Sequence, residues 1–212
     1  MANAMKDALT PAEVSVVAGV PLRDVNRVID ERILPARYYS VGADRIRLFR
    51  AGACSLIAFY FQAAGRLTSE ERIRTIVATR ADHFDSGSPA RQWMVRSEFL
   101  TIDLSSFVRE TQARMDRLAQ ARALVVEDAE ILGGVPVILG TRVPVYDVAA
   151  SVAAGEPMER ILAAYSGLNA ESVELAVLYA QANPLRGRRR RGQKLPEGAV
   201  VLTSRKMPRT RG

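Results

Sequence analysis

Residues 124–147, LVVEDAEILGGVPVILGTRVPVYD, constrain the fold of this chain more than any other stretch. Valine, isoleucine and proline dominate the stretch, which favours two short paired strands and disfavours a helix. Gly133 and Gly134 can adopt the positive φ angles of a tight hairpin turn, and Gly140 would end the return strand. Pro144 then delays the start of the next helix. The stretch therefore predicts a β-hairpin that leads into short helices.

Three short helices are predicted to follow this hairpin. The first two are expected at residues 146–154 and 157–165, and Gly155 closes the first. Asn169 caps the third helix, which ends before Pro184. This order of helices suggests a homeodomain-like unit.

The last of these helices, AESVELAVLYAQA, carries Glu171 and Glu174 and no basic residue. A recognition helix reads bases through Arg, Lys, Asn or Gln side chains, and this helix lacks them on its first turns. The glycine-threonine-arginine run at 140–142 is expected to form a turn, with Arg142 paired to a nearby acid such as Asp147. We predict that the three-helix unit serves dimer or partner contacts and not DNA.

A helix-turn-helix followed by a wing is predicted at the N-terminus. Thr10-Pro11-Ala12-Glu13 has the pattern of a capping box with proline at the first helical position, and Gly19 ends the helix that it starts. Pro21 opens a second helix, LRDVNRVIDERI, whose apolar residues form one stripe. Two short helices joined by a glycine-containing turn are typical of a helix-turn-helix. A hairpin turning at residues 42–44 would supply the wing.

The polar face of the second helix and the wing provide the candidate DNA contacts. Arginine can donate to guanine and asparagine to adenine in the major groove, and arginines of a wing can contact phosphates or the minor groove. A solvated helix face is the alternative, and the surrounding winged-helix pattern favours DNA. The candidate DNA-binding residues are Arg23, Asn26, Arg27, Arg37, Arg45 and Arg47.

The middle of the chain is predicted to contain a buried helix, a capped helix and a loop. Residues 52–64 are apolar nearly all round, so their helix should be buried. A second capping box at Thr68 and Glu71 starts a helix that ends near Thr79. Residues 81–90 are rich in Ser, Gly, Pro and Asp and predict a loop, near which we place a domain boundary.

Beyond this loop, residues 93–103 alternate between apolar and polar side chains and predict one strand. Residues 104–122 predict a connecting helix. Its apolar stripe could pair two copies of the chain or pack onto its own domain, and the pattern favours neither. The stripe consists of Phe107, Val108, Thr111, Met115 and Leu118.

The net charge of +7 arises at the C-terminal end of the chain. Residues 186–212 contain ten Lys and Arg residues and one acid, Glu197, whereas residues 123–185 sum to −6 and residues 10–50 to +2. A nucleic-acid backbone would be attracted to the tail, weakly to the N-terminal segment, and repelled by the acidic unit. The tail is predicted to be disordered unless a partner orders it, because it has too little apolar surface to bury.

Catalysis and metal binding have little support in the sequence. The single histidine, His83, lies in a predicted loop, and the single cysteine, Cys54, lies in a predicted buried helix. This composition argues against a zinc cluster or a histidine-based nucleophile. Glu127, Asp128 and Glu130 are better explained as a solvated hairpin edge than as metal ligands. We expect no catalytic residue, no metal and no cofactor.

The composition also bears on where the chain would be found. A lone cysteine agrees with a reducing compartment, and the sequence has neither an apolar run of membrane-spanning length nor the apolar core of a signal peptide. The expected location is cytoplasmic, with no membrane partner.

The overall prediction is a mainly α chain with small β-hairpins. It comprises an N-terminal winged helix-turn-helix, a C-terminal β-hairpin with a three-helix homeodomain-like domain, and a disordered basic tail. The predicted boundaries are 1–85 for the winged helix, 91–122 for the strand and connecting helix, 123–184 for the acidic domain and 185–212 for the tail.

Two stretches resemble known families. From about residue 123 to 184, the motifs GG, PVI, GTR and PV followed by three short helices resemble, almost end to end, a small antitoxin domain catalogued as a domain of unknown function. Its members include VapB-type antitoxins that partner VapC-like PIN-domain ribonucleases. The segment LTPAEVSVVAGVPLRDVNRVIDERIL with the following wing resembles the N-terminus of MerR-type regulators.

These resemblances imply a type II antitoxin that inhibits a PIN-domain ribonuclease toxin and represses its own operon, as a homodimer or a larger complex with the toxin. The tail would then be a toxin-neutralising arm whose arginines pair with the carboxylates of the nuclease. A non-specific nucleic-acid tether and a solubilising tail are the alternatives for this segment. The candidate toxin-binding residues are Arg186, Arg188, Arg189, Arg190 and Arg191. A stand-alone MerR-like regulator and an RNA-binding protein are the other functions left open.

Overall fold

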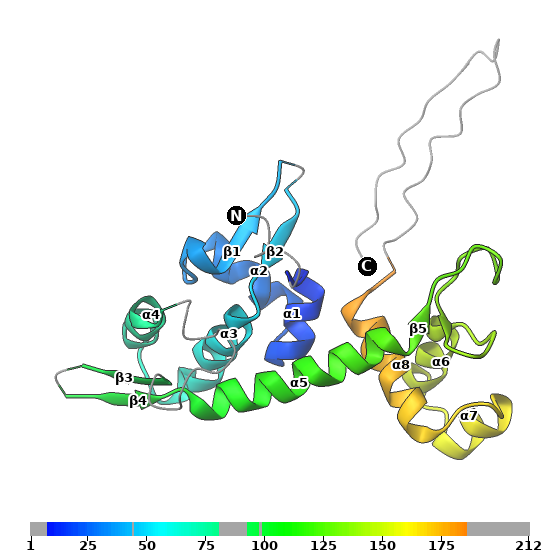
Figure 1. Ribbon diagram of the computed structural model, residues 1–212. Coiled ribbons are helices and arrows are strands. Elements are labelled where there is room, and N and C mark those ends of the chain that lie inside the picture. Colours follow the sequence, from blue (N-terminus) through cyan, green and yellow to red (C-terminus); the bar gives the residue numbers. More distant parts are fainter. Residues whose placement is uncertain (1–7, 44, 81–92, 98, 186–212) are drawn as a thin grey trace, which may run out of the picture.

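The computed structural model describes residues 8–43, 45–80, 93–97 and 99–185, and this part of the chain is mainly helical with small antiparallel strand pairs (Figure 1). The predicted loop at 81–90 with His83, and the tail from residue 186 with its five candidate arginines, lie outside the described residues. Within the described part, no helix is both long and apolar enough to cross a bilayer.

The first two helices begin where the sequence indicates, and the first also ends there, whereas the second ends at Asp30, three residues before the predicted Ile33. Helix α1 spans Pro11–Ala18 behind the Thr10–Glu13 capping box, and Gly19 ends it with a φ of 68°. Helix α2 spans Leu22–Asp30 and buries its apolar stripe. The chain then forms a short 3-10 helix, η1 (Ala36–Tyr38), and a two-stranded hairpin. Its strands are β1 (Tyr39–Val41) and β2 (Arg47–Phe49), paired antiparallel.

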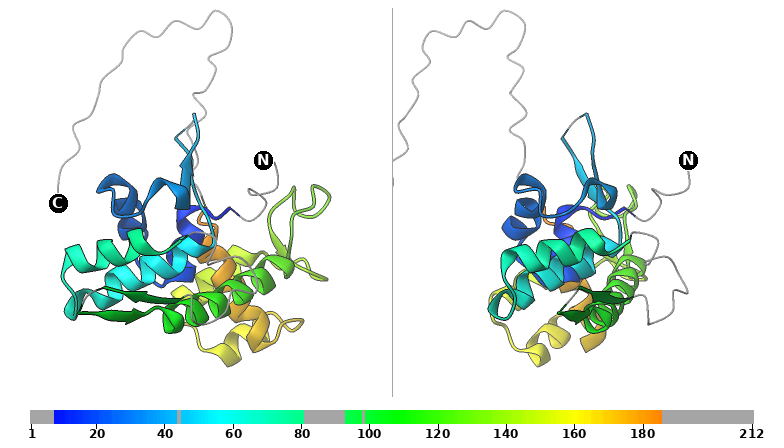
Figure 2. Two further views of the ribbon diagram at one scale, coloured as in Figure 1. Left: turned by 60° about the vertical axis from the view of Figure 1, so that its left-hand side comes forward. Right: turned by 90° about the vertical axis from the view of Figure 1, so that its left-hand side faces the viewer.

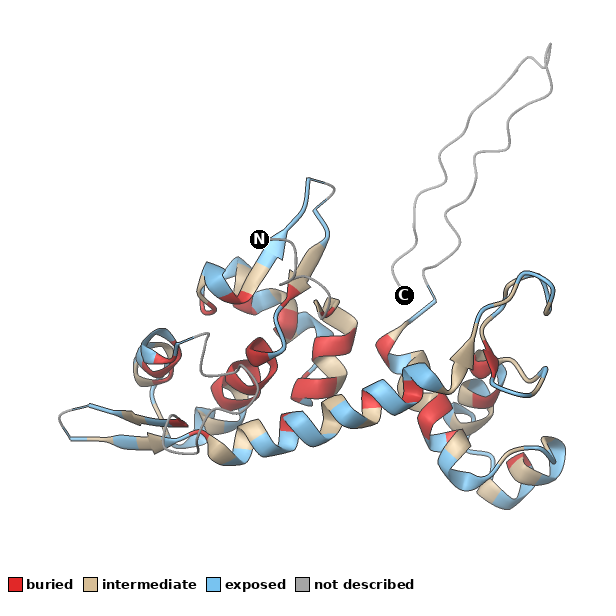
Figure 3. Cartoon of the chain, in the orientation of Figure 1, coloured by how far each residue is buried: buried red, intermediate tan, exposed pale blue. Residues whose placement is uncertain are grey.

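Helix α3 (Gly52–Gln62) is the centre of the N-terminal core, and it is buried on every side from Gly52 to Tyr60. Buried residues gather on α3 and on the facing side of α1 (Figure 3). A short 3-10 helix, η2 (Ala63–Gly65), leads to α4 (Ser69–Ala78), which starts at the predicted Thr68–Glu71 capping box. The all-round apolar pattern of residues 52–64 therefore predicted this helix correctly.

Cys54 is expected to be inert in the folded protein. Its side chain is fully buried in α3, and burial raises the pKa of the thiol to about 12. An ordinary exposed cysteine at about pH 8 is partly ionised and reacts readily with aromatic disulfide reagents. We expect native protein to leave the reagent unreacted. Urea-unfolded protein should form a mixed disulfide at its single cysteine and release one equivalent of the reagent's aromatic thiolate. Rapid labelling under native conditions would contradict the burial of α3.

Residues 93–103 form two strands, so the prediction of one strand is wrong. Strands β3 (Met94–Arg96) and β4 (Thr101–Asp103) pair antiparallel, with Val95 opposite Ile102. Between them the backbone N–H of Ser97 donates to the Leu100 carbonyl at 2.8 Å, which closes a turn. The apolar residues 95 and 102 differ in parity, so a single strand would have placed them on opposite faces.

Helix α5 (Ser105–Ala123) runs along the molecule, with the N-terminal helices beside its first part and the C-terminal unit at its other end (Figure 1 and Figure 2). Its apolar stripe packs onto the N-terminal core. Leu118 is fully buried there, and the Thr111 hydroxyl lies 2.6 Å from that of Ser55 in α3. Packing within the chain, one of the two alternatives that the sequence left open, is therefore observed, and pairing of two copies stays a prediction.

The C-terminal hairpin is looser than predicted. Strands β5 (Val125–Val126) and β6 (Val137–Ile138) are two residues each, and residues 127–136 separate them. Gly133 and Gly134 do adopt positive φ angles, of 68° and 84°, but their turn, closed by the Gly134 N–H donating to the Ile131 carbonyl at 3.1 Å, lies within this long loop and does not join the two strands directly. Asp128 begins a turn instead of extending the strand: its carbonyl accepts from the Ile131 N–H and its carboxylate from the Glu130 N–H, both at 2.9 Å.

Three helices follow the hairpin in the predicted order: α6 (Val145–Ala153), α7 (Met158–Ala164) and α8 (Ala170–Ala182). They enclose a second, smaller core with β6. The expected pairing of Arg142 with Asp147 is not formed, and Arg142 makes no ion pair with any described residue. The Thr141 hydroxyl instead closes the turn, donating to the Ile138 carbonyl at 2.7 Å.

Helix α8 joins the two cores. Its Ala182 is buried in the N-terminal core, and its Glu171 and Glu174 both pair with Arg117 of α5 at 3.2 and 3.0 Å. At the end of α5, Arg122 donates to the Glu13 carboxylate of α1 at 2.5 Å. The acidic residues of α8 therefore hold the helix against α5, which is a role that the sequence did not indicate.

Candidate nucleic-acid interface

Helix α2 and the β1–β2 hairpin carry the candidate DNA-binding residues. Arg23 and Arg27 are exposed on α2, whereas Val25 and Val28 face the core. In the hairpin, Arg45 is exposed in the turn and has a φ of 61°. Within the described part of the chain, the side chains of Arg23 and Arg45 make no hydrogen bond or ion pair, so their guanidinium groups are available to an anion.

Arg47 fastens the hairpin to α2. Its guanidinium donates to the Asp30 carboxylate at 2.5 Å and to the backbone oxygen of Asn26 at 3.1 Å. A third contact joins it to the Asn26 side-chain oxygen at 3.2 Å. Arg47 therefore sets the position of the β1–β2 hairpin relative to α2, and its contact with phosphate stays a prediction. Asp30, the acid one turn after Asn26, is the partner that the sequence analysis missed.

The remaining side chains of α2 interact within their own helix. Arg27 pairs with Glu31 at 2.7 Å, and this hydrogen bond raises the already high pKa of the guanidinium. The Asn26 amide donates to the Leu22 carbonyl at 3.1 Å. Both Arg27 and Glu31 are about half exposed, so a phosphate or a base edge could replace the carboxylate at little cost.

Arg37 lies apart from this surface. Its guanidinium donates to the carbonyl oxygens of Val77 and Thr79 at 2.7 and 2.9 Å, at the C-terminal end of α4. It also lies 5.0 Å from the centre of the Tyr38 ring. A cation at this helix end satisfies carbonyl groups that have no partner within the helix. Five of the six candidates therefore lie on α2 and the β1–β2 hairpin, whereas Arg37 caps the C-terminal end of α4.

The acidic residues of the C-terminal hairpin do not form a metal site. No group of three potential metal ligands occurs among the described residues. Glu127 instead accepts a hydrogen bond from the Tyr179 hydroxyl at 3.1 Å. Burial and this hydrogen bond raise the pKa of Tyr179 to about 12. Glu127 thus ties the hairpin to α8.

Comparison with known proteins places the chain in a family. A family model described as "Protein of unknown function (DUF433)" matches residues 125–180, inside the 123–184 range that the motifs delimit. The uncharacterized protein y4eO of Sinorhizobium fredii is 53% identical to this chain over 214 residues, which is 98% of this chain and 96% of that protein.

A solved structure shows a weaker similarity. The crystal structure of Rv2018 from Mycobacterium tuberculosis aligns with 81% of this chain and 97% of its own, at 18% identity and a TM-score of 0.35. A TM-score of this size does not establish a common fold. From its similarity to y4eO along nearly the whole of both sequences, and from the match at residues 125–180, the chain belongs to the y4eO family and carries a DUF433 domain.

Proposed function

We propose that the chain is a DNA-binding antitoxin. In this proposal the N-terminal part acts as a winged helix that binds operator DNA, and the homeodomain-like C-terminal part with the basic tail holds a PIN-domain ribonuclease in an inactive complex. The operon that encodes both proteins would be the target of repression.

The surface of α2 and its attached wing is the observation that carries this proposal. An α-helix fits the major groove, and Arg23 and Arg27 stand on the exposed side of α2. Arg47 holds the hairpin against the same helix, so Arg45 at the hairpin turn can contact the backbone beside the groove. Two copies would bind inverted half-sites about one helical turn apart, roughly 34 Å.

The toxin half of the proposal is supported by the motifs at 123–184 and by the charge of the tail. PIN-type nucleases hold their metals with clustered carboxylates, and arginine forms bidentate, charge-assisted pairs with such groups. The five arginines between residues 186 and 191 supply this chemistry. The strand-forming AVVLT segment would add to the toxin surface as the tail folds on binding.

The DNA half is tested with the double variant Arg23→Ala/Arg27→Ala. The substrate is the DNA upstream of the gene, measured by fluorescence anisotropy at fixed salt against an unrelated duplex. Each lost base contact costs about 1–3 kcal/mol, so the loss of two should lower the affinity for the specific duplex by roughly 30-fold or more. Arg160→Ala, an arginine of α7 with a 76% exposed side chain, is the matched control and should bind normally. Unchanged binding by the double variant would remove α2 from the interface.

The wing is expected to separate two kinds of arginine. Arg45→Ala should weaken binding to all sequences alike and lower the slope of log affinity against log salt by about 1, because one phosphate contact is lost. Arg47→Ala should instead release the wing from Asp30, and Asp30→Ala should reproduce its effect. If Asp30→Ala binds as well as the unmodified chain, Arg47 does not act through the wing.

The toxin half is tested by co-expression with the small open reading frame next to the gene, followed by pull-down and a ribonuclease assay. We expect a stable complex without nuclease activity, and recovery of activity when residues 186–212 are deleted. Full inhibition by the truncated chain would exclude the tail as the neutralising arm.

Specific DNA binding with no co-purifying partner would identify a stand-alone MerR-like regulator. Nucleic-acid binding that disappears with the tail and survives loss of Arg23 and Arg27 would indicate an RNA-binding protein.

A further inference from the structure

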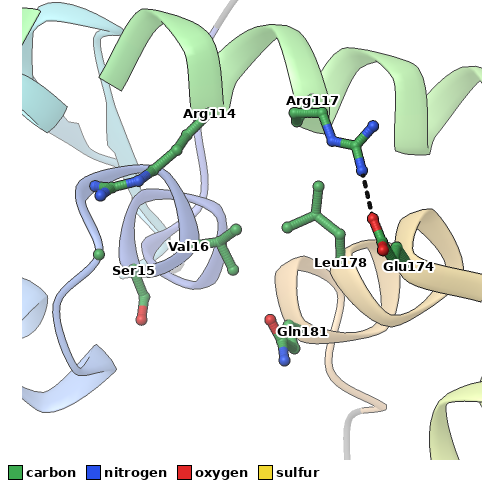
Figure 4. A pocket seen from close by; sticks show the side chains of 8 residues that line it. Ser15, Val16, Arg114, Arg117, Glu174, Leu178 and Gln181 are labelled. Carbon is green, nitrogen blue, oxygen red and sulfur yellow. Dashed lines mark hydrogen bonds and ion pairs between the residues drawn. The ribbon is translucent and has the colours of Figure 1, made fainter. Parts of the chain in front are cut away.

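A groove with a volume of about 640 Å³ lies where α1, α5 and α8 meet (Figure 4). Its size falls in the range of small-molecule sites, which is about 300–1,000 Å³. The groove is formed jointly by the first helix of the chain and the last described helix. Its lining residues are Ser15, Val16, Gly19, Arg114, Arg117, Glu174, Leu178 and Gln181.

The chemistry of the groove differs between its parts. Val16 and Leu178 provide an apolar surface between α1 and α8 (Figure 4). Arg117 is already paired with both Glu171 and Glu174. Its charge is therefore neutralised within the protein, and this end of the groove does not favour a second anion.

Arg114 is the available cation of the groove. Its two contacts are long, 3.4 Å to the Val17 carbonyl and 3.5 Å to the Glu110 carboxylate. The side chains of Arg114 and Glu110 are 40% and 54% exposed, so their pairing contributes little and can be exchanged for another carboxylate. Arginine has five N–H donors, and most of those on Arg114 have no protein acceptor within the described residues.

Gly19 makes room for this guanidinium. A Cβ at position 19 would lie 2.8 Å from the Arg114 Nη1 atom, closer than real Cβ contacts allow. The positive φ of 68° at Gly19 also disfavours any residue with a side chain. The glycine that ends α1 thus shapes one end of the groove.

We propose that the groove binds a small carboxylate with an apolar body. The carboxylate pairs with Arg114, the apolar body covers Val16 and Leu178, and the Gln181 amide offers a further hydrogen bond. An occupant would contact α1, α5 and α8 together and stabilise the docking of α8 on α1. None of the residues that line the groove is among the candidate DNA-binding or toxin-binding residues.

The test compares acids with their amides on the full chain. Phenylacetate and hexanoate, each against phenylacetamide and hexanamide, are titrated by thermal shift and by two-dimensional NMR. We expect the acids to raise the melting temperature and to shift the resonances of Val16 and Leu178, and the amides to bind at least tenfold more weakly. Equal effects of an acid and its amide, or no effect of either acid at millimolar concentration, would overturn the proposal.

Variants of α5 locate the carboxylate. Arg114→Gln should abolish the preference for acids, and Arg114→Lys, which retains the charge, should recover part of it. Arg109→Gln removes an exposed arginine of the same helix that does not line the groove and should leave binding unchanged. A preference for acids that survives in Arg114→Gln, with that variant folded by circular dichroism, would also refute the assignment.

Discussion

Replacing Phe59 by alanine is expected to lower the free energy of unfolding by about 3–5 kcal/mol, the usual range for a large aromatic side chain removed from a core. Phe59 is 1% exposed in α3, and its ring meets that of Phe107 in α5 edge-on, with 5.6 Å between centroids. The substitution removes both the buried apolar area and this contact between helices. Urea unfolding followed by circular dichroism measures the loss.

Phe99 supplies the matched control, because it is the same residue type at 97% exposure. Phe99→Ala should change the free energy of unfolding by less than about 0.5 kcal/mol, as expected for a surface substitution away from caps and ion pairs. A similar loss for Phe59→Ala and Phe99→Ala would contradict the placement of α3 at the centre of the core.

The second large effect is expected at Glu13, whose alanine variant should lose about 2–3 kcal/mol of unfolding free energy because hydrogen bonds to charged groups are lost. The Glu13 carboxylate closes the capping box of α1, accepting from the Thr10 N–H at 2.8 Å. It also accepts from Arg122 at 2.5 Å, and its side chain is only 7% exposed. The substitution therefore weakens the start of α1 and the contact between α1 and the end of α5.

A double-mutant cycle with Arg122→Ala isolates the ion pair from the cap. We expect a coupling energy of about 1 kcal/mol or more between positions 13 and 122, in the range seen for residues in contact. Additive losses would mean that the Glu13–Arg122 pair contributes nothing to stability, although the two groups are adjacent in the structure.

The capping box of α4 measures the contribution of such a cap without an additional ion pair, for comparison with the capping box of α1. Glu71 closes it at the surface, and the hydrogen bond from the Thr68 backbone N–H lowers the pKa of the Glu71 carboxyl below its ordinary value of 4.5. A lowered pKa in the folded state means that the stabilisation is present above that ordinary value and is lost as the pH falls through the folded pKa. Near neutral pH, Glu71→Ala should thus lower the free energy of unfolding less than Glu13→Ala does. In acid, the unfolding free energies of Glu71→Ala and of the unmodified chain should become equal.

The groove lies at α1, α5 and α8, whereas the proposed DNA surface lies on α2 and the β1–β2 hairpin. Helix α1 supports α2 through the N-terminal core and contacts α8 on another side. A change in how α8 docks on α1 would therefore reach the helix that carries Arg23 and Arg27. The pair Arg122–Glu13 joins α5 to α1, and the pair Arg117–Glu174 joins α5 to α8, so α5 is bound to both helices.

Local sequence patterns were sufficient for most of the helices. Each capping box, at Thr10–Glu13 and at Thr68–Glu71, closes hydrogen bonds between residues three apart, so the pattern alone specifies where the helix starts. Gly19 and Gly155 likewise end helices through positive φ angles that other residues rarely adopt. Because α3 is apolar on all sides, its sequence alone predicted that the helix is buried.

The partners of the charged residues depended on tertiary structure. Arg37 caps α4, Arg47 fastens the β1–β2 hairpin to α2, and Arg142 makes no ion pair with a described residue. A long, flexible arginine side chain can reach several acceptors. The acceptors that it pairs with here belong to segments far away in the sequence, so local sequence does not identify them. Glu171 and Glu174 of α8 likewise pair with a residue distant in sequence, Arg117 of α5. Helix boundaries are set by neighbours in sequence and could be predicted, whereas the ion pairs and the groove arise only once distant helices pack together.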